Sequence, residues 1–135
     1  MFTKHKLELI MGNLKVSGTL NNSEAAQKIM QCLPFRARMR RWGGELYFSL
    51  PEAIDDQGDS TSSLQAGTLA FWPPGNAFCI FFGPTPMSTS FVPVPSSEVC
   101  IIGALDSIPK ELFSIPESTQ VELFLTERKV STRPS

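Results

Sequence analysis

Three arginines at alternate positions are the residues whose type and spacing best suit ligand binding. Arg36, Arg38 and Arg40 alternate with apolar residues, and this period of two is typical of a β-strand with one basic face. Their guanidinium groups would lie ~7 Å apart along that face, where such groups can bind a carboxylate, a phosphate or a backbone carbonyl. A second interpretation is a solvent-facing strand whose charge is balanced by acidic neighbours such as Glu45 or Glu122.

Aromatic side chains could supply an apolar surface beside these arginines. Phe81 and Phe82 are neighbours in a strand-like segment, so they point to opposite faces. We expect one of them, with Trp72 or Met87, to face outward, because an exposed apolar patch beside arginines is what a groove for an extended peptide requires. We therefore predict a ligand-binding groove on the outside of the protein, near residues 83–88, with seven candidate residues: Arg36, Arg38, Arg40, Phe48, Trp72, Phe82 and Met87.

Other catalytic or metal chemistry has little support in the sequence. The one histidine, His5, stands at the start of the first predicted strand, and three cysteines lie far apart without a CxxC pair: Cys32, Cys79 and Cys100. We expect no metal site and no cofactor. The acidic segment 55–59 lacks the rest of a calcium-binding pattern, and the sequence has no GxSxG, P-loop or GxGxxG motif.

The composition indicates one ordinary globular domain. The chain has 135 residues, of which 41% are apolar and 19% charged, and its net charge is −1. This balance gives no bias toward nucleic acid or an acidic membrane, and no apolar run approaches the ~18 residues of a membrane-spanning helix. We expect a single domain over residues 1–127 and a polar tail over residues 128–135. The odd cysteine count and the lack of a signal-like segment predict a reduced, cytoplasmic protein, whereas the oligomeric state is not determined by the sequence.

Short β-strands must position these candidate residues. Eight segments carry strand and turn signals: residues 6–11, 14–20, 35–40, 45–50, 68–72, 77–82, 99–105 and 120–125. Two short helices are predicted, one following the capping oxygens of Asn22 and Ser23 and ending before Pro34, and one over Pro109–Phe113. Short strands at this density are typical of a sandwich or a barrel, and the pattern alone does not separate the two.

A long aromatic motif favours the barrel over the sandwich, because it resembles a known family. The segment WPPGNAFCIFFGPTPMS, preceded by GGELYFSLP at Gly43–Pro51, resembles a small cyclophilin-like family of bacteria and archaea over nearly the whole chain, from about Lys4 to Glu127. The resemblance implies a mainly β protein: a closed, eight-stranded antiparallel barrel with two short helices, related to the fold of the peptidyl-prolyl isomerases. Fold alone does not carry function across that relation.

Three functions are compatible with these features. The favoured one is a non-enzymatic domain that binds a peptide or small ligand in a groove on the side of the barrel. The second is weak prolyl isomerisation, which needs only an apolar proline pocket and a donor such as arginine near the twisting amide. FCIFFGP is similar to the Phe-Phe strand of true cyclophilins, but Ile80 stands where Gln would precede the pair. The third is an enzyme acting on a small anionic substrate, with one of the three arginines as its anchor.

Overall fold

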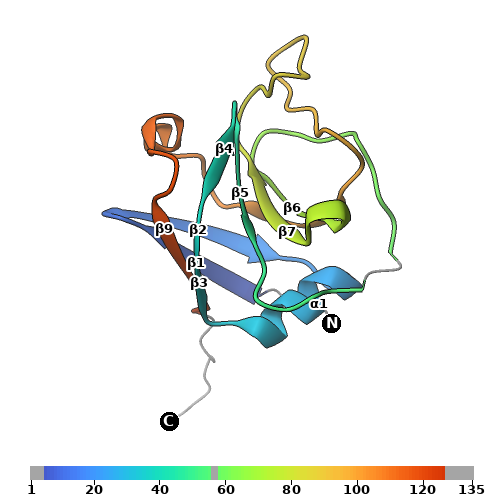
Figure 1. Cartoon of the computed structure of the whole chain (residues 1–135), viewed down its shortest axis with the longest axis vertical. Coiled ribbons are helices and arrows are strands. Elements are labelled where there is room, and N and C mark those ends of the chain that lie inside the picture. The colour runs from blue at the N-terminus through green and yellow to red at the C-terminus, as the bar shows by residue number, and fades with distance from the viewer. Residues whose placement is uncertain (1–4, 56–57, 127–135) are drawn as a thin grey trace.

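The structure, a computed structural model that describes residues 5–55 and 58–126, has nine β-strands in one antiparallel sheet (Figure 1). The sheet curls into a nearly closed barrel with the strand order β3-β9-β1-β2-β8-β6-β7-β5-β4. The strands are β1 His5–Met11, β2 Leu14–Leu20, β3 Phe35–Arg38, β4 Arg40–Trp42, β5 Glu45–Ser49, β6 Thr68–Trp72, β7 Ala77–Phe81, β8 Cys100–Leu105 and β9 Gln120–Leu125. The predicted tail, residues 128–135, lies outside the described residues.

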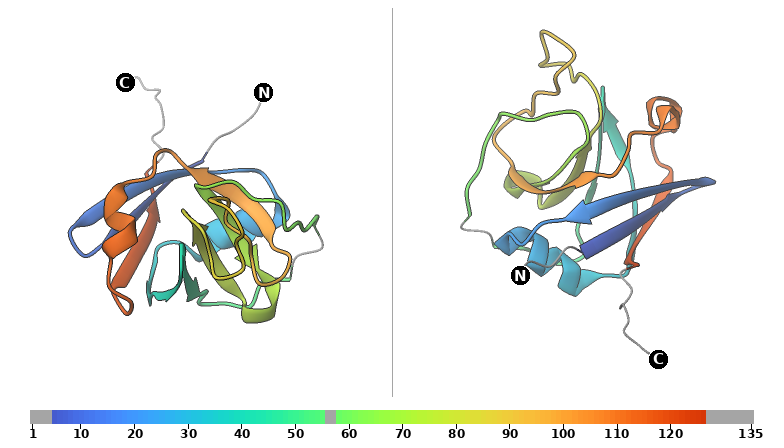
Figure 2. Two further views of the ribbon diagram at one scale, coloured as in Figure 1. Left: turned by 90° about the horizontal axis from the view of Figure 1, so that it is seen from above. Right: turned by 180° about the vertical axis from the view of Figure 1, so that it is seen from behind.

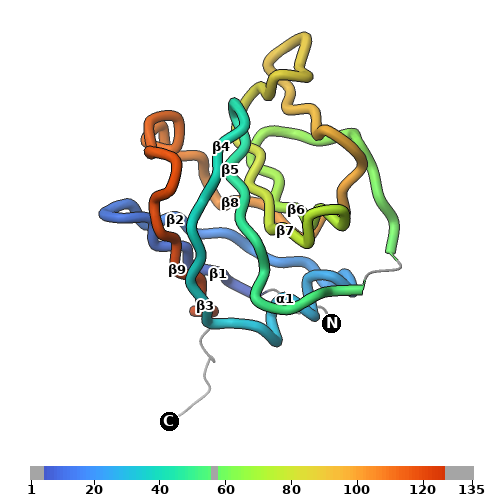
Figure 3. Tube along the Cα trace, in the orientation of Figure 1, coloured from blue at the N-terminus to red at the C-terminus, as the bar shows by residue number. Residues whose placement is uncertain are grey.

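The two edge strands of this sheet are neighbours along the chain, and together they close the barrel (Figure 3). β3 pairs with β9, β4 pairs with β5, and only Met39 separates β3 from β4. The side chain of Met39 is buried, and its backbone bonds to Thr119 and Ser118 in the turn before β9. The predicted antiparallel barrel is therefore confirmed. The predicted strand over residues 35–40 is two strands because the chain changes its partner at Met39, so the described strands number nine rather than eight.

Tight turns join the hairpins where the sequence predicts them. Gly12, in the turn between β1 and β2, has a φ of +62°. A short 3₁₀ turn, η1 (Pro73–Gly75), and Asn76 join β6 to β7, and Asn76 has a φ of +48°. Glycine and asparagine are the residues that adopt this left-handed conformation most readily. The Gly-Asn and Pro-Pro-Gly-Asn sequences thus account for both reversals.

One α-helix and a second 3₁₀ turn complete the described fold (Figure 2). α1 (Glu24–Cys32) begins at Ser23, whose side chain accepts a hydrogen bond from the Ala26 amide, and it buries Ile29 against the barrel core. It covers the end of the barrel at the bottom of Figure 1, while η2 (Lys110–Ser114) lies toward the other end. The second predicted helix is therefore a single 3₁₀ turn. Among the described residues no helix has the length and apolar character needed to cross a membrane.

The Phe-rich hairpin of β6 and β7 packs on both of its faces. Phe71, Phe78 and Ile80 are buried in the barrel interior. A second, smaller core lies on the outer face of the same strands and contains Leu64, Ala70, Ala77, Cys79, Phe81 and Val99. Leu64 precedes β6 and Val99 precedes β8, so the segments that carry these two residues cover this outer face. Figure 1 shows both segments looping around β6 and β7. The hairpin is apolar at almost every position because neither face meets water.

Candidate functional site

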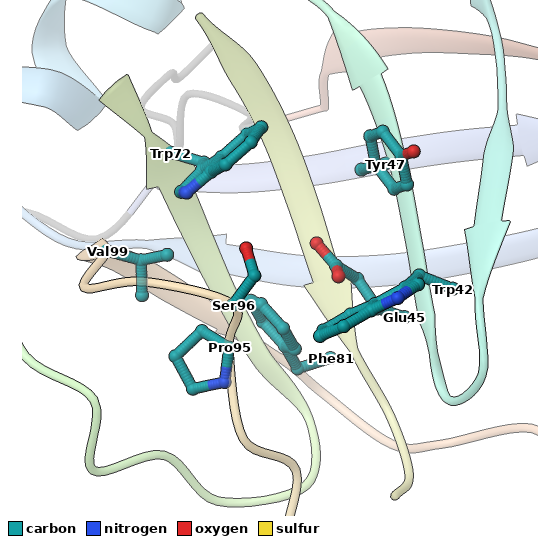
Figure 4. Close-up of a pocket in the computed structure, with 8 residues that line it drawn as sticks. All are labelled: Trp42, Glu45, Tyr47, Trp72, Phe81, Pro95, Ser96 and Val99. Atoms are coloured by element: carbon teal, nitrogen blue, oxygen red, sulfur yellow. The ribbon is translucent and has the colours of Figure 1, made fainter. Parts of the chain in front are cut away.

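A pocket opens on the outer wall of the barrel, beside this second core. It has a volume of about 190 Å³. Four of its walls are aromatic rings, and one residue that lines it, Glu45, carries a charge (Figure 4). The full set is Trp42, Glu45, Tyr47, Trp72, Phe81, Pro95, Ser96 and Val99.

Strand register brings the pocket residues together from four strands. Trp42 on β4 is paired with Glu45 on β5, and Glu45 is paired with Phe81 on β7. These three residues therefore form one row across the outer wall. Tyr47 lies two residues beyond Glu45 on the same face of β5, because side chains alternate along a strand. Trp72 ends β6 and supplies the fourth ring.

The turn after β6 holds the ring of Trp72 in place. The indole Nε1 of Trp72 donates a hydrogen bond of 2.7 Å to the Ser97 hydroxyl. On the other side the ring packs against Gly75, where a Cβ atom would lie only 2.6 Å from the Cζ3 atom of the ring. Glycine at this position therefore lets the turn and the ring lie in contact.

An irregular but well-bonded segment, residues 85–98, forms the roof of the pocket. The buried hydroxyl of Thr85 donates to the carbonyl of Val94 at 2.5 Å, and the Ser88 hydroxyl donates to the carbonyl of Val92 at 2.8 Å. These bonds brace the segment from within. Pro95, itself buried, and the exposed Ser96 follow directly and lie over the pocket.

Glu45 is a buried carboxyl that titrates near neutrality. Its side chain is 7% exposed, and this burial raises its pKa to about 7, although a hydrogen bond from the Cys79 thiol acts in the opposite direction. Burial, followed by the charge of Glu45 and that hydrogen bond, raises the pKa of the Cys79 thiol well above its usual value. Cys79 is therefore a thiol and a donor at neutral pH, not a nucleophilic thiolate.

Among the seven residues predicted from the sequence, Trp72 is the one that lines this pocket. Phe48 and Phe82 face the barrel interior: Phe48 stacks on Phe78 with ring centroids 5.1 Å apart, and Phe82 meets Phe113 edge-on. The prediction that these two phenylalanines form an outer groove is thus corrected. Alternation along β5 directs Phe48 inward, and Phe82 directly follows Phe81, which ends β7 and lines the outer pocket instead. Met87 lies in the roof segment, residues 85–98, but it is 53% exposed and does not line the pocket.

The three predicted arginines lie on the outside of β3 and β4 and interact with β9 and the turn before it. Arg36 and Arg40 approach Glu122 and Glu117, each with a closest nitrogen–oxygen distance of 3.9 Å. Arg38 donates to the carbonyl of Ser118 at 2.9 Å. This arrangement matches the alternative interpretation of a solvent-facing strand with acidic neighbours. Binding of a ligand by these arginines stays a prediction.

The sequence predicted Glu45 as a neighbour of the arginines but did not predict its place in the pocket. The alternation of Glu45 and Tyr47 with Leu46 and Phe48 was a readable signal, since it puts the carboxyl and the phenol on one face. The cross-strand register with Trp42 and the position of the roof could not be read from local sequence. Among the described residues, no three His, Cys, Asp or Glu side chains gather closely enough to hold a metal ion.

Comparison with known proteins identifies the family. A family model described as Cyclophilin-like matches residues 5–124. The chain belongs to the cyclophilin-like family. This cyclophilin-like domain is also similar to a solved structure, the solution structure of the hypothetical protein AF2241 from Archaeoglobus fulgidus, with a TM-score of 0.79 and 27% sequence identity over 92% of this chain and 96% of that chain. No curated protein matches the chain. The resemblance predicted from the aromatic motif is confirmed.

Proposed function

We propose that this cyclophilin-like domain is a binding module that holds a small ligand in its outer-wall pocket. The observation that carries the proposal is the Glu45 carboxyl, buried among four aromatic rings. Burying a carboxyl is costly unless a partner compensates for the lost water, and the thiol of Cys79 is a weak donor. A strongly perturbed titratable group in a concave apolar site is typical of a functional site.

The size of the pocket favours a small ligand or a single group of a larger one. At about 190 Å³, it is smaller than the ~300–1,000 Å³ of sites that enclose drug-sized molecules. An extended peptide could place one side chain in it but could not bury its backbone there. The pocket therefore has room for one compact chemical group, either a small ligand or a single side chain of a larger one.

The two enzymatic alternatives have less support from this geometry. Prolyl isomerisation needs a donor such as arginine at an apolar pocket, and no arginine is among the eight residues that line this one. A small anionic substrate would meet the carboxyl of Glu45, which repels it when ionised. The pocket therefore favours a neutral or cationic ligand.

A fragment screen by NMR tests the proposal. The indole N–H signals of Trp42 and Trp72 report directly on two walls of the pocket. We expect some neutral or cationic fragments to shift both signals in a saturable manner, and a Trp72→Ala variant to lose that binding. Phe91→Ala is the matched control, since Phe91 lies in the roof segment but is 88% exposed and does not line the pocket. A screen in which no fragment shifts either indole signal would contradict the proposal.

A further inference from the structure

We infer that the group bound in the pocket is an alkylated ammonium ion, with the Glu45 carboxylate as its counter-charge and the surrounding aromatic rings as its walls. This inference rests on the proposed function and specifies its ligand. It concerns the chemistry of the group, whether that group belongs to a free small molecule or to a modified lysine side chain.

The rings surround the carboxyl from several directions. In Figure 4 the carboxylate of Glu45 points into the space between the rings of Trp42, Tyr47 and Trp72, with Phe81 beside it. The faces of aromatic rings carry partial negative charge and attract cations, most strongly in the case of tryptophan. Wherever the faces of the two tryptophan, one tyrosine and one phenylalanine rings line the pocket, they add to the attraction of the Glu45 carboxylate for a cation.

The protein directs its neighbouring cations elsewhere. Arg40 stands opposite Tyr47 on β4, but its guanidinium approaches Glu117. Arg41 donates to the carbonyls of Leu112 and Ile115, at the end of the barrel that carries η2. Glu45 is the one charged residue among the eight that line the pocket. A ligand that brings a positive charge would compensate for its burial.

The residues that line the pocket favour a tertiary or quaternary ammonium over a primary ammonium. A primary ammonium has three N–H donors, and each needs an acceptor when it is removed from water. Among the pocket side chains with acceptor oxygens, only Glu45 is buried, whereas Tyr47 is half-buried and Ser96 is exposed. The pocket therefore does not offer three buried acceptors to a primary ammonium. Methyl groups on the nitrogen would instead spread the charge over a surface that packs against the rings. A quaternary or tertiary ammonium therefore fits both the charge and the apolar character of the site.

Matched ligands separate charge from shape. The full chain, labelled with ¹⁵N, is titrated at about pH 8.5 with tetramethylammonium and choline, and with 3,3-dimethylbutanol, the neutral isostere of choline. Two further ligands are short peptides that carry trimethyllysine or unmodified lysine. We expect choline to bind at least about tenfold more tightly than its neutral isostere. We also expect Glu45→Gln to lose most of that difference while Phe91→Ala keeps it.

The outcomes distinguish this inference from the proposed function. Equal binding of choline and its neutral isostere would overturn the ammonium inference and leave a small-ligand site in place. Binding of other fragments without any binding of the cations would do the same. If neither cations nor any fragment binds, both the inference and the proposed function fail.

Tighter binding of the trimethyllysine peptide than of choline would support a modified lysine as the source, and the reverse would support a free cation. Circular dichroism and urea unfolding of Glu45→Gln verify that the variant is folded.

Discussion

The thiol of Cys79 on β7 lies beside the buried carboxyl of Glu45 on β5 and partly offsets the rise in the pKa of that carboxyl, while its Sγ atom also contacts the Ala77 carbonyl at 4.0 Å. This contact joins the outer core to the candidate pocket, because Cys79 packs with Ala70 and Phe81 in that core. A thiol is a weak donor and compensates only partly for burial. The carboxyl is consequently held near the balance between its neutral and charged forms at physiological pH.

Replacing Glu45 with glutamine should remove a pH-dependent component of stability. The pKa of this carboxyl is raised to about 7 in the folded protein, against about 4.3 in an unfolded chain. Between these values the folded state binds more protons than the unfolded state, so the free energy of unfolding falls as the pH rises. The contribution is fully present below the unfolded pKa and is lost as the pH passes about 7.

Urea unfolding at about pH 5 and about pH 8 measures this component, which we expect to be on the order of 1–3 kcal/mol. The change in unfolding free energy between these two pH values is compared for the original protein and for Glu45→Gln. The contributions of the other titrating groups are the same in both proteins and cancel in this difference. Glu117→Gln is the control, since that carboxyl is largely exposed. If Glu45→Gln and the original protein show the same pH dependence, Glu45 has an ordinary pKa.

Arg41 should matter more for stability than the three alternating arginines. Its guanidinium donates to the carbonyls of Leu112 at 2.9 Å and Ile115 at 2.7 Å, and it lies 5.7 Å from the centre of the Phe82 ring. Lysine cannot reproduce this planar set of donors. We expect Arg41→Lys to lower the free energy of unfolding by ~1–3 kcal/mol.

Arg40→Lys is the matched control, because Arg40 is exposed and its ion pair with Glu117 is long, at 3.9 Å. Exposed pairs of this kind contribute ~0–1 kcal/mol. Both variants are compared by urea unfolding. Equal effects of the two substitutions would show that the bonds from Arg41 to the η2 region do not stabilise the fold.

Local sequence signals predicted most of the fold, but only part of the site. Period-two segments and turn residues such as Gly12 and Asn76 identified the strands and hairpins, since these features depend on neighbouring residues. The division at Met39 depends on a change of strand partner, which no local pattern records. The inward direction of Phe82 was also hidden, because β7 is covered on both faces and its apolar run has no visible period.

Gly75→Ala should disturb the pocket although Gly75 is not itself one of the residues that line it. The new methyl group would lie within 2.6 Å of the Trp72 ring, which a hydrogen bond to Ser97 restrains from the other side. We expect a loss of ~1–3 kcal/mol in unfolding free energy, as is typical of overpacking. We also expect a changed Trp72 indole N–H signal and weaker ligand binding.

Pro74→Ala is the control for this variant, since it alters the same exposed turn without adding an atom near the ring. It should leave the Trp72 signal close to its original position. An unchanged Trp72 signal in Gly75→Ala would mean that the ring is not held against the turn.

Binding of an ammonium ion should strengthen as the pH rises through about 7, because only the ionised form of Glu45 attracts a cation. The other titratable groups that face Glu45 are Cys79 from β7 and Tyr47 from its own strand, with Arg40 of β4 opposite Tyr47. The raised pKa of the Cys79 thiol keeps it neutral in this range. Tyr47→Phe should therefore retain the pH profile, while Glu45→Gln should abolish it.

Proton release provides a second measurement of the same effect. A bound cation favours the carboxylate, so near pH 7 binding should expel up to about half a proton per site. Calorimetric titration with choline in two buffers of different ionisation enthalpy measures this number directly. Release by the original protein and by Tyr47→Phe, but not by Glu45→Gln, would assign the proton to Glu45. An affinity that is flat or falls with rising pH, with no proton released, would show that the cation binds without Glu45 as its counter-charge.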